Sequence, residues 1–113
     1  MSPSDHTHDA ERPGPIRIAV PDYVYPLIPS FLDNRRHDIA TIQDALSRQD
    51  YGTIRLLGHR MKGDGGSFGL DRISEIGAAL EQAAGLPDVA SMQRSLEDLV
   101  DFVARLEVTK QDS

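Results

Sequence analysis

One histidine, His59, has neighbours that could support chemistry on its imidazole ring. If the surrounding stretch is helical, each residue advances about 100° around the axis, so Arg55, Lys62, Gly63 and Gly66 lie on the same face as His59. A histidine side chain, with an unperturbed pKa near 6.5, offers a neutral, nucleophilic nitrogen at neutral pH. The two cations could offset the charge of an incoming phosphoryl group, and the two glycines would let another protein approach the ring.

The apolar residues of the same stretch indicate where the ring of His59 points. Ile54, Leu57 and Met61 fall within about 60° of one another and form a stripe that should face a core. His59 lies about 160° from the centre of this stripe, so we expect its side chain to be exposed. Most exposed histidines on helices are inert, so the residues alone establish only an accessible imidazole flanked by cations.

The other histidines are weaker candidates for such a site. His37 follows Arg35 and Arg36 but has no neighbouring glycines, so we interpret it as a solvated surface residue. Arg35 and Arg36 are expected to rim a docking surface if their helix packs beside that of His59. His6 and His8 have no further ligands near them, and we predict no metal site.

Apolar periodicity predicts the helices that position this face. From Asp22 to Leu46, apolar residues recur at spacings of three, four and seven, which indicates a first helix whose start is blurred by Pro29. Asp50 is a suitable N-cap for the second helix. We expect this helix to end near the glycines of residues 63–66, since each glycine costs about 1 kcal/mol in a helix interior.

Two more helices follow. The third is predicted from about Leu70 to Ala84, where Gly85 and Pro87 stop it. The fourth has an unbroken three-and-four pattern made by Val89, Met92, Leu96, Leu99, Val103 and Leu106. Because short connections favour antiparallel neighbours, the sequence predicts an all-α, antiparallel up-down-up-down four-helix bundle.

The ends of the chain show no sustained period. The first residues mix Pro13, Gly14 and Pro15 with polar side chains, which is typical of a flexible tail. We find no alternation of β-branched residues and expect no strands. The predicted organisation is a flexible N-terminal tail (1–21), the bundle (22–109) and a C-terminal tail (110–113).

Composition narrows the classes of function. A chain of 113 residues is the size of one domain and leaves no room for a kinase catalytic domain beside the bundle. The net charge of −6 argues against nucleic-acid binding. Residues 35–63 nevertheless hold six cations against three acids, which suits an acidic partner surface. No apolar run reaches the roughly 18 residues of a membrane span, and without cysteine or a secretory signal we expect a cytoplasmic protein.

The stretch LGHRMKGDGGSFGLDRISEIGAALEQAA resembles the signature of the histidine phosphotransfer (HPt) family. That signature has a phospho-accepting His, an aliphatic residue two positions later, then Lys-Gly, and further on a Gly and a Leu-Glu pair. The matching residues here are His59, Met61, Lys62, Gly63, Gly69, Leu80 and Glu81. The resemblance covers about residues 22–107.

The resemblance implies that His59 accepts a phosphoryl group from a receiver-domain aspartate and passes it to another, without kinase activity of the chain's own. Lys62 would help to hold the phosphoryl group, and Gly63 would leave room for the receiver. The remaining candidates for phosphoryl or partner binding are Arg55, Arg60, Gly66 and Asp64. Asp64 replaces the small polar residue usual after Lys-Gly, and its charge could weaken loading or tune partner choice.

The implied partners are response-regulator receiver domains and a hybrid histidine kinase, with the chain acting as a monomeric phosphoprotein in signal transduction. No cofactor is expected, because any Mg²⁺ would be held by the receiver domain. Three alternatives stay open. One is a bundle that binds receivers without carrying phosphate, and another is a dimer built on the fourth helix. The third is the helix pair of a sensor kinase, which Arg60 and the lack of a nearby Pro after His59 disfavour.

Overall fold

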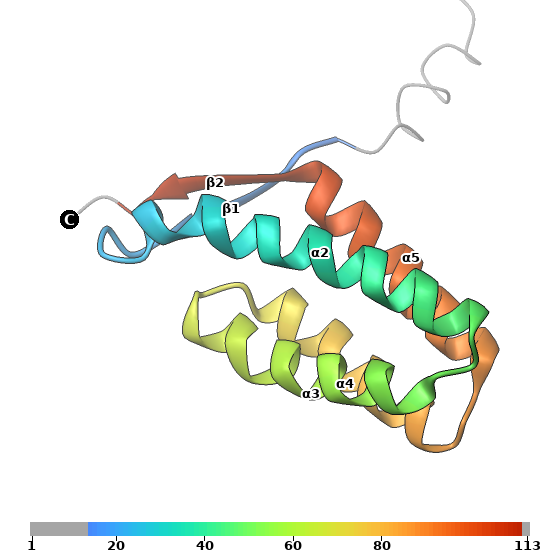
Figure 1. The fold of residues 1–113 in the computed structure, drawn as a ribbon. Helices are drawn as coiled ribbons and strands as arrows, with labels where there is room; N and C mark the ends of the chain where they lie inside the picture. The colour runs from blue at the N-terminus through green and yellow to red at the C-terminus, as the bar shows by residue number, and fades with distance from the viewer. Residues whose placement is uncertain (1–13, 112–113) are drawn as a thin grey trace, which may run out of the picture.

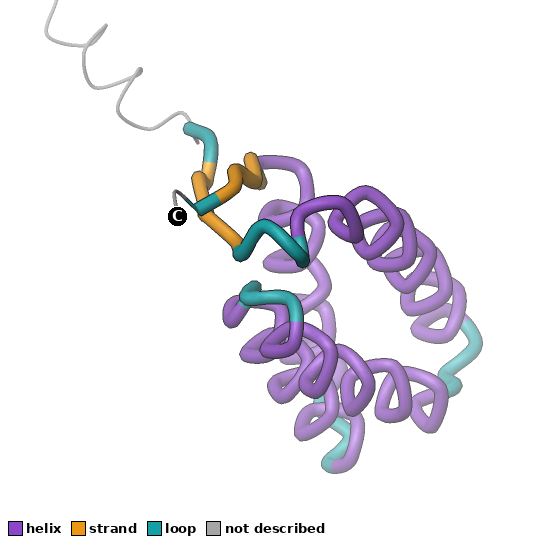
Figure 2. Tube along the Cα trace, turned by 90° about the vertical axis from the view of Figure 1, so that its left-hand side faces the viewer, coloured by secondary structure: helices purple, strands orange, loops and turns teal. Residues whose placement is uncertain are grey.

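The structure, a computed structural model, describes residues 14–111. Four helices make up most of this part of the chain. They are α2 (Ile28–Ser47), α3 (Tyr51–Ser67), α4 (Asp71–Gly85) and α5 (Val89–Arg105), and a 3-10 turn, η1 (Tyr25–Leu27), precedes α2. Each helix runs opposite to the one before it (Figure 1), and the four helices lie around a common centre (Figure 2). The buried apolar side chains between them form one core. The predicted antiparallel four-helix bundle is confirmed.

The apolar stripes pack where the periodicity predicts. In α5 the side chains of Met92, Leu96, Leu99 and Val103 are buried, whereas Val89, at the first position of the helix, is exposed. From the other helices the core receives Ile42, Ile54, Met61, Ile73, Ile76 and Leu80. Because Ile54 and Met61 point inward, the opposite side of α3 faces outward.

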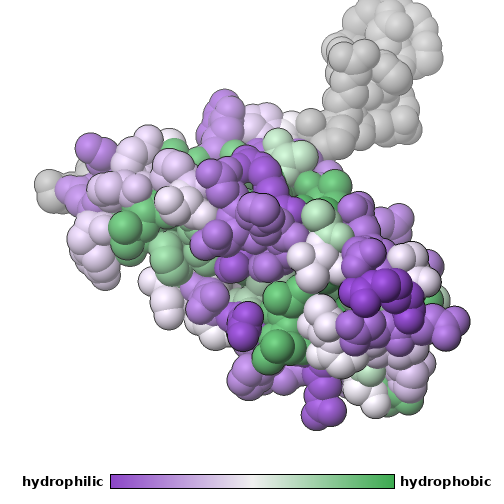
Figure 3. Space-filling view, in the orientation of Figure 1, coloured by the Kyte–Doolittle hydropathy of each residue, from purple (hydrophilic) through white to green (hydrophobic). Residues whose placement is uncertain are grey.

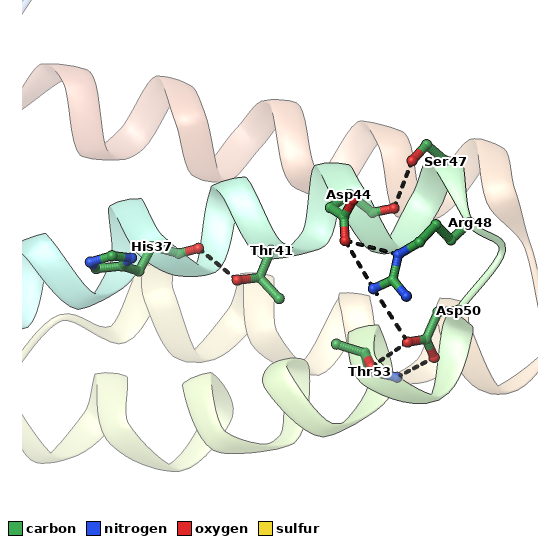
Figure 4. Close-up of polar contacts among 7 residues, drawn as sticks. All are labelled: His37, Thr41, Asp44, Ser47, Arg48, Asp50 and Thr53. Carbon is green, nitrogen blue, oxygen red and sulfur yellow. Dashed lines mark hydrogen bonds and ion pairs between the residues drawn. The ribbon is translucent and has the colours of Figure 1, made fainter.

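The turn between α2 and α3 is fixed by polar contacts (Figure 4). Asp50 is the N-cap of α3, as predicted, and accepts a hydrogen bond from the backbone N–H of Thr53 at 3.2 Å. Hydrogen bonds from Thr53 hold the pKa of Asp50 below its usual range. Arg48 donates to Asp44 at 2.9 Å and lies 3.9 Å from Asp50. These contacts fix where α3 begins.

Glycines bring α3 and α4 unusually close together. A Cβ atom on Gly58 would lie 2.7 Å from the carbonyl oxygen of Gly77, and one on Gly77 would lie 2.5 Å from the backbone nitrogen of Lys62. Farther along, Gly65 packs against Ser74, whose hydroxyl donates to the carbonyl of Lys62 at 2.7 Å. The two helices therefore touch backbone to backbone, and side chains of α4 can reach the outer face of α3.

The expectation of no strands was wrong. Strand β1 (Ile16–Val20) pairs in parallel with β2 (Leu106–Lys110), with Ile16 opposite Leu106 and Val20 opposite Lys110. Residues 16–20 are therefore not a free tail, and Lys110 belongs to a strand rather than to a C-terminal tail. Both strands alternate partly buried or buried apolar residues with exposed ones, but over only five residues each, and the pairing depends on the bundle bringing the two ends together.

Two helix boundaries also differ from the prediction. The first helix begins at Ile28 instead of near residue 22, because prolines fit the first turn of a helix and Pro29 occupies that turn. The second continues through its glycines to Ser67, because contacts with α4 outweigh their low helix propensity. Residues 1–13 of the predicted N-terminal tail, with His6 and His8, lie outside the described residues. None of the helices in the described part is long and apolar enough to cross a membrane.

Candidate functional site

His59 lies on the outward face of α3 with its side chain 67% exposed. This agrees with the expectation from the helical periodicity of the sequence. The core residues Ile54 and Met61 lie on the opposite side of the helix. The ring is thus open to a partner in the resting chain.

A carboxylate of the neighbouring helix holds the ring of His59. Oε2 of Glu81, on α4, lies 2.8 Å from Nδ1 of His59, and Oε1 lies 3.4 Å from Nζ of Lys62. A hydrogen bond from His59 and the charge of Lys62 lower the pKa of Glu81, although desolvation opposes the shift. An ionised carboxylate only accepts, so we assign the imidazole proton to Nδ1. Nε2 then keeps a free lone pair on the exposed side of the ring.

Gly63 and Gly66 leave the surface beside His59 bare. A Cβ atom on Gly63 would meet nothing within 4 Å, and one on Gly66 would lie 3.6 Å from the hydroxyl of Ser74. Packing within the chain therefore does not require glycine at position 63. A glycine that weakens a helix by about 1 kcal/mol without such a requirement suggests access by another molecule.

The predicted cations divide between the two sides of His59. Arg55 and Lys62 lie on the α4 side, where they line a shallow hollow with Glu81, Gln82 and Gly85. Arg60 is exposed, and its charge acts on Asp38 of α2, so it belongs to the α2 side. The face of α3 that carries His59 is therefore flanked by positive charge on both its α4 side and its α2 side.

Arg35 does not rim this surface, contrary to the expectation from the sequence. Its side chain is only 8% exposed and makes ion pairs with Asp38 at 2.8 Å and with Asp64 at 3.8 Å. Burial raises the pKa of Asp38, and the nearby Arg35 guanidinium opposes that shift. The sequence predicted that the charge of Asp64 affects phosphoryl loading or partner choice. In the structure Asp64 forms an ion pair with Arg35, a buried cation of α2.

Arg36 and His37 lie apart from the candidate site. Arg36 pairs with Asp33 at 2.8 Å and lines a groove against β2. His37 is exposed on α2, where only its backbone carbonyl is drawn in a contact, as acceptor from the Thr41 hydroxyl (Figure 4). Within residues 14–111, His37 has no glycine on the adjoining turns and forms no ion pair with a carboxylate.

Sequence reasoning missed two residues of this surface. Glu81 matched the family signature but was assigned no role. The glycines Gly58 and Gly77 face each other where α3 and α4 touch, and they were the signal in the sequence for how the two helices align. That alignment brings Glu81 to His59. Leu56, half-exposed three residues before His59, is the exposed large hydrophobic residue of α3. Apolar surface appears over the middle of α3 among hydrophilic residues (Figure 3), as partner surfaces often show.

Comparison with known proteins identifies the family of the chain. No curated protein and no solved structure gave a significant match. A sequence model of the Hpt domain matches residues 27–109, which include all four helices. The chain therefore belongs to the Hpt domain family, whose members transfer phosphoryl groups in two-component phosphorelays and interact with receiver domains and histidine kinases.

Proposed function

We propose that this protein is a phosphorelay intermediate in which His59 accepts a phosphoryl group from a receiver-domain aspartate and passes it to another receiver aspartate. The observation that carries the proposal is the contact between Nδ1 of His59 and Glu81 at 2.8 Å, with the rest of the ring exposed. That contact leaves Nε2 as the nucleophile. The other site residues, including Arg55, Arg60, Gly66 and Asp64, are proposed to receive the partner.

The transfer needs no proton movement at the start. The Nε2 lone pair attacks phosphorus, the bond from phosphorus to the aspartyl oxygen breaks, and the aspartate leaves as a carboxylate. Positive charge develops on the ring as the N–P bond forms, and the Glu81 carboxylate at Nδ1 offsets it. Return of the phosphoryl group to a second aspartate reverses the same steps.

Lys62 lies where its positive charge can offset the negative charge of a phosphoryl group on His59. Its Nζ atom shares the Glu81 carboxylate with His59, so it lies near the ring before any phosphoryl group arrives. At a solvent-exposed site, attraction between unit charges about 4 Å apart is worth only about 1 kcal/mol. Lys62 therefore orients the phosphoryl group, and the energy of transfer comes from the acyl phosphate of the donor.

The test is transfer from a purified receiver domain phosphorylated on its aspartate with Mg²⁺ present. We expect label to appear on this protein in a form that acid removes and base does not, and then to pass to a second receiver. Tandem mass spectrometry should map the label to the peptide that contains His59. Stable binding of the receiver without label would instead indicate an adaptor that carries no phosphate.

Glu81→Ala should slow phosphoryl uptake by roughly tenfold, because the ring loses its fixed tautomer and the charge that offsets it. Glu81→Gln is the matched control, since its amide oxygen still accepts from Nδ1. Its rate of phosphoryl uptake should lie between the rates of the wild type and of Glu81→Ala. The pKa of Glu81 is lowered in the folded protein, so its carboxylate contact is present above the unfolded value of 4.5 and is lost only below that pH. The wild-type advantage should therefore persist from pH 8 down to about 5 in single-turnover assays, and equal rates would contradict the role of Glu81.

A further inference from the structure

Arg35 is a buried cation whose hydrogen-bonding capacity is not filled. Its side chain lies 8% exposed within α2, with the guanidinium carbon 4.6 Å from the centroid of the Phe31 ring. Nε lies 2.8 Å from Asp38, yet neither Nε nor Nη1 has a partner of good hydrogen-bond geometry. Burying a charge in this way costs free energy that packing alone does not return.

The second acid near Arg35 comes from the helix that carries the acceptor. Nη1 of Arg35 lies 3.8 Å from Oδ2 of Asp64, which directly follows Gly63 and lies five residues after His59. Five residues rise about 7.5 Å along a helix, so Asp64 is close to an Nε2 phosphoryl group without touching it. Asp64 is 54% exposed, and its charge would act through solvent on any anion docked there.

A phosphoryl group brings nearly two negative charges, and the receiver brings the carboxylate that donates or accepts it. An uncompensated acid beside them would disfavour both loading and docking. Arg35 can cancel that charge from inside the bundle, where it does not compete with Lys62 for the phosphoryl group. Arg60 is exposed and acts on Asp38, whereas the ion pair that the structure gives Asp64 is with Arg35.

We propose that Arg35 is a positioning residue for phosphotransfer, which holds the Asp64 carboxylate on the α2 side of α3 and offsets its charge beside the phosphoryl group. The inference rests on the proposed function. It adds an ion pair between α2 and α3 on which the rate of phosphoryl transfer at His59 depends. Arg35 touches neither the phosphoryl group nor the receiver.

The test compares transfer rates from a phosphorylated receiver domain for Arg35→Met, Asp64→Asn and the double variant, in the full chain. Arg35→Met should be slower by about threefold to tenfold at low salt, since Asp64 then repels the incoming charge. Adding Asp64→Asn should restore the rate to within about twofold of the wild type. Asp38 loses its partner equally in Arg35→Met and the double variant, so it does not affect that comparison.

Salt concentration separates charge from packing. Because the Debye length shortens from about 10 Å at 0.1 M to about 3 Å at 1 M, salt should narrow the gap between Arg35→Met and the wild type. If Arg35→Met does not fold, Arg35→Lys keeps the charge and should transfer within about twofold of the wild type. A double variant as slow as Arg35→Met, or a gap unchanged by salt, overturns the proposal. A wild-type chain that takes no label overturns the proposed function itself.

Discussion

The His59→Gln variant is expected to take up no phosphoryl label from a phosphorylated receiver domain, a loss of at least a hundredfold. Glutamine offers no nucleophilic nitrogen, but its amide can still donate a hydrogen bond to Glu81. The side chain at position 59 is mostly exposed, so the free energy of unfolding should change by less than about 0.5 kcal/mol. Label counting after short incubations, with circular dichroism to verify the fold, measures both quantities.

His37→Gln is the matched control, because His37 is the other exposed histidine within the described bundle. Its hydrogen bond within the described residues is through the backbone carbonyl, which the substitution retains. We expect this variant to accept label at the wild-type rate. Label that persists in His59→Gln and disappears in His37→Gln would move the acceptor site to α2.

Helical periodicity predicted the bundle well where one face of a helix is continuously apolar. Met92, Leu96 and Leu99 repeat without interruption, and all three are buried in α5. Local capping chemistry was equally informative, since Asp50 begins α3 as expected. Both signals lie within a few residues along the chain, so a single sequence carries them completely.

The two strands could not be predicted in the same way. Each is five residues long, and the partner of Ile16 is Leu106, at the other end of the chain. The short alternation in residues 106–110 follows directly on the helical pattern of α5, and the sequence was interpreted as a continuation of that helix up to Leu106. Pairing of this kind depends on the folded bundle, which no local pattern encodes.

The candidate site also combines features that one helix determines with features that depend on packing between helices. The exposure of His59 and the nearness of Lys62 follow from the geometry of one helix. The contacts of Glu81 and Arg35 depend on how α4 and α2 pack against α3. Arg35 misled the prediction because arginine is rarely buried, whereas here it pairs with two acids.

Gly63→Gln is expected to slow transfer from a phosphorylated receiver by about tenfold to a hundredfold, while the fold persists. Apart from its chain neighbours and the adjoining backbone of α3, no described atom lies within 4 Å of a Cβ placed on Gly63, so a side chain there starts from an open surface. Replacing a helical glycine should raise the free energy of unfolding by up to about 1 kcal/mol, which urea denaturation can measure. A variant with a higher free energy of unfolding but a lower transfer rate would show that the defect lies in docking of the receiver domain and not in the fold.

Gly63→Ala is the control that separates side-chain size from helix propensity. Alanine gains at least as much helix propensity as glutamine but projects only a methyl group, so transfer should slow by no more than about threefold. Gly58→Ala gives the opposite case, because its Cβ would lie 2.7 Å from the backbone of Gly77 and should destabilise the packing of α3 on α4. If Gly63→Gln and Gly63→Ala transferred at the same rate as the wild type, the bare surface beside His59 would have no part in partner access.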